Sequence, residues 1–164
     1  MAMRYNGKED RLILDLQTGE TAVSYWLTRK AVPRLWTLLC EMMRRDPAMK
    51  DVADERIRDF LVDVGREAAM KKVRLGEKRT PNRQSPGTPV PLLAEAFKGR
   101  VTPRSQFLLR IVDQGNVVAL PWLLTPPLLH GLCRLLVQSL TKTDWKIELY
   151  DGAPVSVASP QSLH

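Results

Sequence analysis

The same succession of sequence patterns for secondary structure occurs twice in this chain of 164 residues, near its start and again near its end. Each copy predicts a strand, a turn, a second strand and a helix, over residues 11–45 and 107–141. After a shift of 96 positions, the aligned identities are Leu12 with Leu108, Gly19 with Gly115, Trp26 with Trp122 and Leu27 with Leu123. One additional residue, Leu124, then aligns the helical parts at Thr28 with Thr125, Leu35 with Leu132, Leu38 with Leu135 and Leu39 with Leu136. An internal pseudo-repeat therefore constrains the fold more than any other feature.

The first copy changes from alternating to helical spacing of its apolar residues. Leu12, Leu14 and Leu16 alternate with their neighbours before a turn at 18–19, and period-two runs around such a turn predict a β-hairpin. Thr28 is the expected cap of the helix that follows. Its apolar residues recur at spacings of three and four: Val32, Leu35, Trp36, Leu39, Met42 and Met43. The Asp-Pro pair at 46–47 is expected to end this helix.

The second copy repeats the plan, with its turn predicted at 113–116. Thr125 is a favourable N-cap, and Pro126 suits the first helical position, where its missing N–H costs no hydrogen bond. The predicted buried stripe of this helix is Leu128, Leu132, Leu135, Leu136 and Leu140. Pro121 indicates a sheet edge or a bulge. Residues 145–151 alternate apolar and polar types and predict a C-terminal strand.

The segment between the copies has no counterpart in either of them. Residues 51–74 predict an amphipathic helix, with Ile57, Phe60, Leu61 and Val64 on one apolar face. Residues 76–91 are rich in proline and polar types and predict a basic, extended connection. A short helix is expected at 91–97.

These elements predict an α+β fold in a single domain, residues 1–164. The two tandem units are expected to form one antiparallel sheet with helices packed on one face, related by a pseudo-twofold rotation. The inserted helix and the C-terminal strand complete the fold. The reason is energetic, since a lone hairpin is marginal in water and one unit cannot bury its own apolar face.

The least polar run of the chain does not predict a membrane span. From 117 to 129 only Thr125 is polar, but a span needs about 20 apolar residues, and Pro126, Pro127 and Arg134 interrupt the run too early. The first residues lack the apolar core of a secretory signal. Cys40 and Cys133 are therefore expected to be buried thiols, and the protein is expected to be cytoplasmic.

The chain shows no pattern typical of a catalytic, metal or cofactor site. Phosphate-binding glycine loops, helical His-Glu-x-x-His and paired Cys-x-x-Cys motifs are all absent from the sequence. His130 is expected to lie at the boundary of a leucine-rich helix, and the acidic residues of 51–67 alternate with arginines as on a solvated helix face. We therefore expect no enzyme, no metal and no cofactor.

Positive charge is concentrated beside the inserted helix. The formal net charge is +7, and a net +5 of it falls within residues 71–83. The cations there are Lys71, Lys72, Arg74, Lys78, Arg79 and Arg83. Such a segment attracts polyanions, although basic residues also favour helix C-termini for local electrostatic reasons.

Trp26 and Trp122 align at the end of the second strand of each copy. Exposed on the sheet, they would be platforms for unpaired bases. Wedged between helix and sheet, they would be core residues, the commoner role for tryptophan at such a junction. We favour the core.

Two functions are compatible with this sequence. The first is a non-enzymatic protein-interaction or assembly module, forming a homodimer or binding another protein through Ile57, Phe60, Leu61 and Val64. The alternative is a protein that binds DNA or RNA through residues 71–83. Neither involves a membrane.

The assembly hypothesis predicts a homodimer that depends on the apolar face of 51–74. Phe60→Glu is expected to disrupt either the dimer or the fold, because a charge on a buried apolar face is strongly unfavourable, and which of the two is lost locates the helix. Sedimentation of the native protein and the variant measures this. A native protein that stays monomeric at high micromolar concentration contradicts the prediction.

Overall fold

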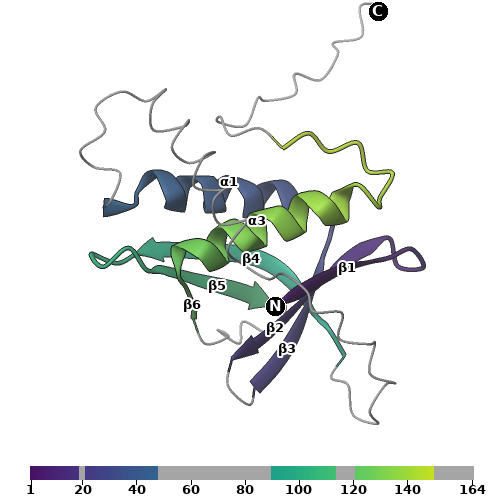
Figure 1. Cartoon of the computed structure of the whole chain (residues 1–164). Helices are drawn as coiled ribbons and strands as arrows, with labels where there is room; N and C mark the ends of the chain where they lie inside the picture. The colour runs from purple at the N-terminus through teal and green to yellow at the C-terminus, as the bar shows by residue number, and fades with distance from the viewer. Residues whose placement is uncertain (19–20, 48–89, 114–120, 150–164) are drawn as a thin grey trace, which may run out of the picture.

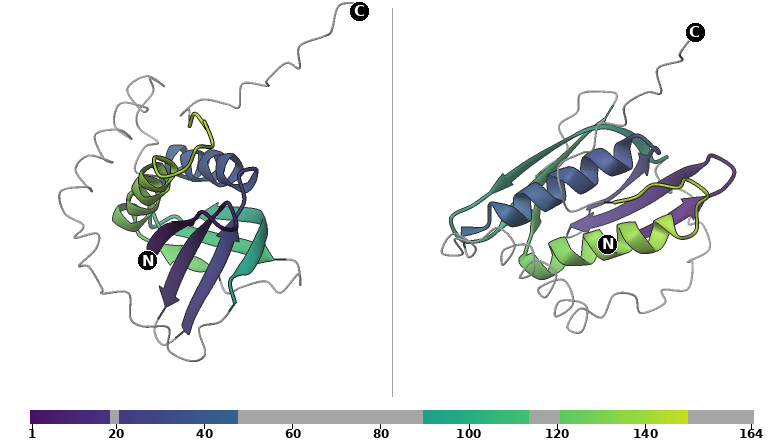
Figure 2. Two further views of the ribbon diagram at one scale, coloured as in Figure 1. Left: turned by 90° about the vertical axis from the view of Figure 1, so that its right-hand side faces the viewer. Right: turned by 90° about the horizontal axis from the view of Figure 1, so that it is seen from above.

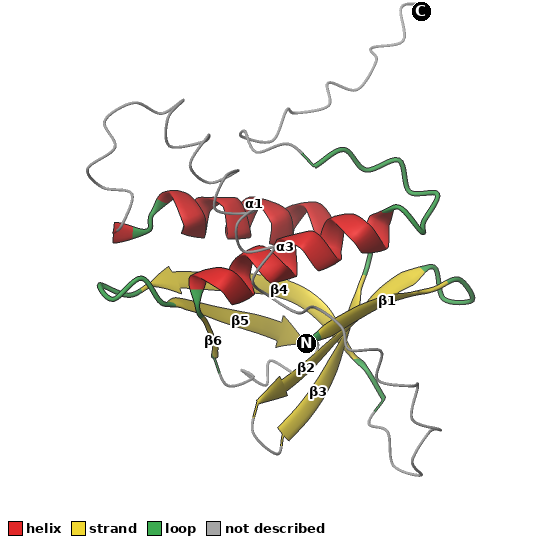
Figure 3. Cartoon of the chain, in the orientation of Figure 1, coloured by secondary structure: helices red, strands yellow, loops and turns green. Residues whose placement is uncertain are grey.

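The computed structural model describes residues 1–18, 21–47, 90–113 and 121–149 (Figure 1). Its strands and helices form a mixed α+β fold, as predicted (Figure 3). The strands are β1 (Ala2–Asn6), β2 (Arg11–Thr18), β3 (Thr21–Leu27), β4 (Leu92–Val101), β5 (Phe107–Asp113) and β6 (Trp122–Leu124). The helices are α1 (Ala31–Arg44) and α3 (Pro126–Leu140).

The six strands form one sheet in chain order, from β1 to β6. Four of its strand pairs are antiparallel, but β3 and β4 are parallel. The expectation of a purely antiparallel sheet is therefore wrong. Parallel neighbours require a long connection, and α1 together with residues 45–91 separates β3 from β4 in the sequence.

The parallel pair also contradicts the expected pseudo-twofold rotation. Strands β1, β2 and β3 alternate in direction, and so do β4, β5 and β6. Because β3 and β4 are parallel, β4 runs in the same direction as β1. A twofold axis normal to the sheet would reverse the second set and make β3 and β4 antiparallel. The two sets of strands are instead offset sideways along the sheet.

The two predicted hairpins are antiparallel strand pairs with matching registers. In β2 and β3, Leu12 pairs with Leu27 and Ile13 with Trp26. In β5 and β6, Leu108 pairs with Leu123 and Leu109 with Trp122. Every partner in the second pair lies 96 positions after its equivalent in the first.

Three local expectations differ from the structure. Residues 92–97 belong to β4 rather than to a short helix, because pairing with β3 and β5 outweighs the helix propensity of a leucine- and alanine-rich stretch. Residues 145–149 form no strand, since Lys146 has a left-handed backbone with φ 44°, which breaks an extended run. The edge strand β1 has no counterpart in the sequence prediction.

A hydrophobic core joins both helices to strands of the sheet. Met3, Leu12, Leu14 and Leu16 contribute to it from β1 and β2. The helical residues in this core are Val32, Leu35, Trp36, Leu39, Cys40, Met42 and Met43 from α1, and Leu129, Leu132, Cys133 and Leu136 from α3. The predicted α1 stripe is confirmed. In α3 four of the five predicted residues are buried or pack against the core, whereas Leu128 is exposed and Leu129 is buried in its place.

Each helix has its own contacts with the sheet. Helix α1 contacts β4, whereas α3 contacts the two edge strands β1 and β6, and the helices lie side by side in contact (Figures 1 and 2). At the start of α1, Thr28 Oγ1 accepts a 3.2 Å hydrogen bond from the Ala31 N–H. Thr125 is the N-cap of α3 without a side-chain capping bond. Cys40 and Cys133 are both buried and are not joined in a disulfide.

Gly99 allows the close approach of α1 to β4. A Cβ atom at this position would overlap Met42 Sδ and would lie 2.9 Å from Leu38 Cδ1. Both atoms belong to α1, so any larger residue must displace side chains of the helix. A side chain at Gly99 would therefore have to move the ends of the Met42 and Leu38 side chains.

Gly99→Val is expected to destabilise the protein by about 1–3 kcal/mol, because it overfills a packed contact. Urea unfolding of the variant and the native protein measures the difference. Gly7→Ala is the control, since a Cβ there would make an ordinary 3.6 Å contact with Tyr5 Cε1. Equal stability of Gly99→Val and the native protein would mean that α1 does not pack this closely on β4.

Candidate functional site

Most of the candidate residues from the sequence lie outside the described residues. This holds for the polyanion-binding candidates, for the interface candidates and for the whole of 51–74, 76–89 and the two predicted turns. The cations concerned are Lys71, Lys72, Arg74, Lys78, Arg79 and Arg83, and the apolar residues are Ile57, Phe60, Leu61 and Val64. Their roles stay predictions.

Trp26 and Trp122 lie on opposite sides of the sheet despite their matching registers. Trp122 pairs with Leu109, a core residue, and packs against the core. Trp26 pairs with Ile13, which alternates with the core residues Leu12 and Leu14. Residues of β5 that face the core lie 95 positions after the core-facing residues of β2, whereas the aligned identities lie 96 positions apart. Because side chains alternate along a strand, this difference of one residue places aligned residues on opposite sides of the sheet. The expectation of equivalent places is therefore wrong.

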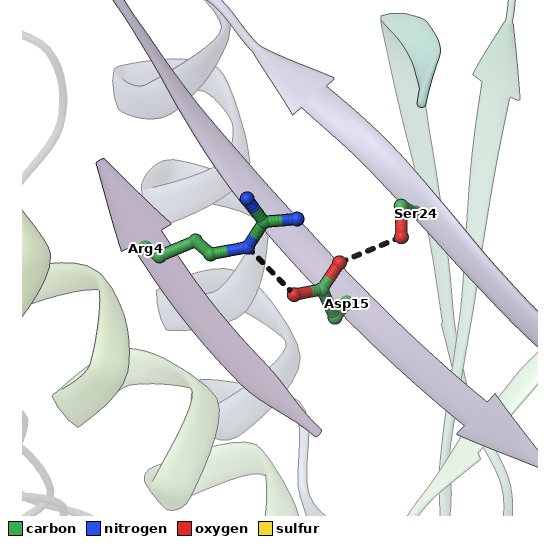
Figure 4. Close-up of polar contacts among 3 residues, drawn as sticks. All are labelled: Arg4, Asp15 and Ser24. Carbon is green, nitrogen blue, oxygen red and sulfur yellow. Dashed lines mark hydrogen bonds and ion pairs between the residues drawn. The ribbon is translucent and has the colours of Figure 1, made fainter. Parts of the chain in front are cut away.

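We call the side of the strands that alternates with the core the outer side. Its part on β1–β3 contains a carboxylate with two partners (Figure 4). Arg4 Nε lies 3.2 Å from Asp15 Oδ2, and Ser24 Oγ donates a 2.6 Å hydrogen bond to Asp15 Oδ1. The charge of Arg4 is thus balanced by a neighbouring strand.

Arg11 and Trp26 form a layered pair on the same outer side. The Arg11 guanidinium carbon lies 5.9 Å from the centre of the Trp26 ring, within the range of a cation–π interaction. Both side chains are partly exposed. Solvent therefore reaches part of each group, although Ile13, the register partner of Trp26 on the same side, is only 2% exposed.

Three cations are gathered on the outer side of β4 and β5. Lys98 is directly opposite Arg110 in the register, and Arg100 is opposite Leu108. The neighbours of these cations point to the core: Phe97, Gly99, Val101, Leu109 and Ile111. Among the described residues, Lys98, Arg100 and Arg110 form no ion pair with a carboxylate. Like charges directly opposite one another destabilise a sheet, so this arrangement favours a bound anion.

Apolar side chains connect the cations with the Arg11–Trp26 pair. Leu93 is the register partner of Trp26 across the parallel pair, and a β-bulge between Ala94 and Ala96 places Leu93 on the same side of β4 as Lys98. At about 3.3 Å per residue, Leu93 and Lys98 are roughly 16 Å apart. Leu123, 52% exposed, pairs with Leu108 at the β6 edge. The resulting surface, which we call the outer patch, comprises Arg11, Trp26, Leu93, Lys98, Arg100, Leu108, Arg110 and Leu123.

The outer patch can bind an anion but contains no group arranged for acid–base or nucleophilic chemistry. In the described part of the chain, no group of three His, Cys, Asp or Glu residues is placed to hold a metal ion. His130 is partly buried on α3. The sequence contains a signal for the basic part of the patch, because Lys98 and Arg100 alternate with Phe97, Gly99 and Val101. The signal is missed when residues 91–97 are taken as a helix.

A second polar cluster joins residues 143–149 to the turn between β1 and β2. Asp10 Oδ1 accepts hydrogen bonds from Trp145 Nε1 and from Tyr5 Oη, the latter 2.8 Å long. The Tyr5 and Trp145 rings meet edge to face with centroids 6.1 Å apart. The bonds from Trp145 and Tyr5 lower the pKa of the Asp10 carboxyl below its usual 3.8. Because Trp145 is only 1% exposed, this contact anchors the chain after α3.

A shallow groove lies beside that anchor. Val137 and Leu140 of α3 line one wall, and Ile147 and Leu149 line the other. Asp144 and Lys146 lie among its polar residues. The lining is mainly apolar, without a convergent set of polar groups, and it supplies no chemistry for a reaction.

Comparison with protein-family models, with curated proteins and with solved structures found no match to this chain. None of the helices in the described ranges is long and apolar enough to cross a membrane.

Asp10→Asn is expected to lower the melting temperature at neutral pH, because asparagine keeps the shape and tolerates the left-handed backbone at φ 47° but loses the charge. The folded-state pKa is lowered, so the stabilisation is present above the unfolded value of 3.8 and is lost as pH falls through the folded value. The difference from the native protein should therefore shrink in acid.

Thermal unfolding at about pH 7 and about pH 2 measures this dependence. Lys8→Gln, in the same turn, is the control and should show no such convergence. A difference that is equal at both pH values would mean that the Asp10 charge does not contribute to stability.

Proposed function

We propose that this protein is a non-enzymatic nucleic-acid-binding protein and that the outer patch is its binding surface. The observation that supports this most directly is the group of Lys98, Arg100 and Arg110, which have no carboxylate partner among the described residues. Phosphates are the anions that a row of such cations suits, and phosphate contacts dominate the affinity of proteins for nucleic acids.

The electrostatics of the patch favour an anionic partner. Opposed residues on antiparallel strands have Cβ atoms about 5 Å apart, so the like charges of Lys98 and Arg110 are held near one another and repel. A phosphate between Lys98 and Arg110 replaces this repulsion with two attractions. On β1–β3, by contrast, Arg4 already has Asp15 as its partner. The charge available to a ligand is therefore concentrated on β4 and β5.

The same charges limit how the outer patch could serve as a homodimer interface. In a twofold interface, only residues at the axis meet their own copies. An axis passing through Lys98, Arg100 and Arg110 would therefore bring like charges together. Homodimerisation or binding to another protein through Ile57, Phe60, Leu61 and Val64 involves residues outside the described part of the chain, and it stays a separate prediction.

The tandem organisation belongs to the same proposal. The units are β1–β2–β3–α1 and β4–β5–β6–α3, with both helices on one face of the sheet, in a single domain derived by internal duplication. The repeated order of strand directions supports this. The outer side of the sheet is then available to a ligand, and the basic segment 71–83 adds long-range attraction for the same polyanion.

Replacing three cations of the outer patch by glutamine is expected to weaken binding to mixed-sequence oligonucleotides at least tenfold at low salt. It should also flatten the dependence of log K on log salt by about two units, since about 0.7 counterions are released per phosphate contact on a single strand. The variant is Lys98→Gln, Arg100→Gln and Arg110→Gln combined. Fluorescence anisotropy across a salt titration measures both quantities.

The control removes the same charge from exposed sites away from the outer patch. It combines Lys8→Gln, Arg34→Gln and Lys142→Gln, at the β1–β2 turn, on α1 and after α3. Its binding should be close to that of the native protein. Equal weakening by both variants would show an effect of net charge alone, and a native protein that fails to bind at low salt would refute the proposed function.

A further inference from the structure

We infer that the outer patch selects single-stranded nucleic acid, with a base stacked at the Arg11–Trp26 pair and the backbone following β4 toward Lys98, Arg100 and Arg110. This rests on the proposed function and specifies its substrate class. It also gives different roles to the two tryptophans that align in the sequence, since Trp26 belongs to the outer patch and Trp122 packs against the core.

The Arg11–Trp26 pair favours a ligand with an unpaired base. Trp26 is partly exposed beside a guanidinium 5.9 Å from its ring centre, and both groups are flat. Unpaired bases stack on aromatic rings and on arginine planes, whereas the bases of a duplex are already stacked on one another. A ligand that uses both members of the pair must therefore offer an unpaired base.

The apolar side chains of the outer patch also favour a single strand over a duplex. Leu93 adjoins Trp26 in the register, and Leu123 is 52% exposed beside Leu108 at the other end. A duplex bound through its phosphates would leave these side chains without an apolar partner. The bases of a flexible single strand can cover them while its phosphates reach the cations, as on other sheet surfaces that bind single strands.

The length and shape of the outer patch suit an extended single strand. The distance of roughly 16 Å from Leu93 to Lys98 accommodates a short stretch of extended strand. In contrast, the described part of the sheet offers no helix or ribbon that projects from the outer side to enter a duplex groove. The surface is suited to a strand lying across it.

The test compares a fluorescein-labelled oligo(dT) with a hairpin duplex of equal nucleotide number, at one low salt concentration, by anisotropy. The native protein is expected to bind the single strand at least tenfold more tightly. Trp26→Leu should lower the affinity for the single strand about tenfold, which is the effect of losing one stacked base. Its salt slope should be unchanged, because no phosphate contact is removed.

Two further variants distinguish stacking from a structural role. Trp26→Phe keeps an aromatic ring and should bind within about threefold of the native protein, while losing the part of the tryptophan fluorescence quenching that Trp26 contributes on binding. Trp122→Phe changes the tryptophan on the core side, and it should lower the melting temperature with affinity within about twofold. These two variants remain informative if Trp26→Leu fails to fold.

The outcomes separate the two proposals. Equal affinity for duplex and single strand, with no effect of Trp26→Leu or Trp26→Phe on affinity or quenching, overturns the single-strand inference and leaves the proposed function standing. Failure to bind either oligonucleotide at low salt overturns both. Binding to poly-glutamate as tight as to oligo(dT), again independent of Trp26, assigns the patch to an acidic protein and also overturns both.

Discussion

The parallel pairing of β3 with β4 is the contact on which the six-stranded sheet depends, because it alone joins β1–β3 to β4–β6 within the sheet. Two register pairs form it, Tyr25 with Leu92 and Trp26 with Leu93. So short a ladder needs support from packing, and the close contact of α1 with β4 at Gly99 provides it. The helix that follows β3 in the chain thus packs on the strand that β3 pairs with, and α3 spans the two edge strands.

This junction also makes the outer patch continuous. Trp26 lies near the end of β3, and its register partner Leu93 lies near the start of β4. The cations of β4 and β5 would otherwise be a separate feature from the Arg11–Trp26 pair. The distribution of carboxylates then divides the surface electrostatically, because Asp15 balances Arg4 on β1–β3, whereas the described carboxylates leave Lys98, Arg100 and Arg110 without a partner.

Local periodicity predicted the hairpin strands β2, β3, β5 and β6, and it placed α1 and α3 well. It failed at β4, where Leu92–Phe97 has helix-forming residues but gains backbone pairing on two sides. It failed again after Trp145, where the left-handed Lys146 ends the extended pattern. The candidate site depended on the first of these errors, since Lys98 and Arg100 can be recognised as neighbours on one side only when their segment is known to be a strand.

The sequence by itself determined the hairpin strands β2, β3, β5 and β6, the two helices and the apolar stripe of α1, because each depends on spacing within one segment. Only the tertiary structure decided that β3 and β4 are parallel, that Trp26 and Trp122 lie on opposite sides, and that Arg110 is opposite Lys98. The β3–β4 pairing joins strands distant in sequence, and the other two features depend on the register within each strand pair, where a slip of one residue exchanges every side chain between the core and the outer side. Such a register is selected by the packing of the whole core, which no single segment contains.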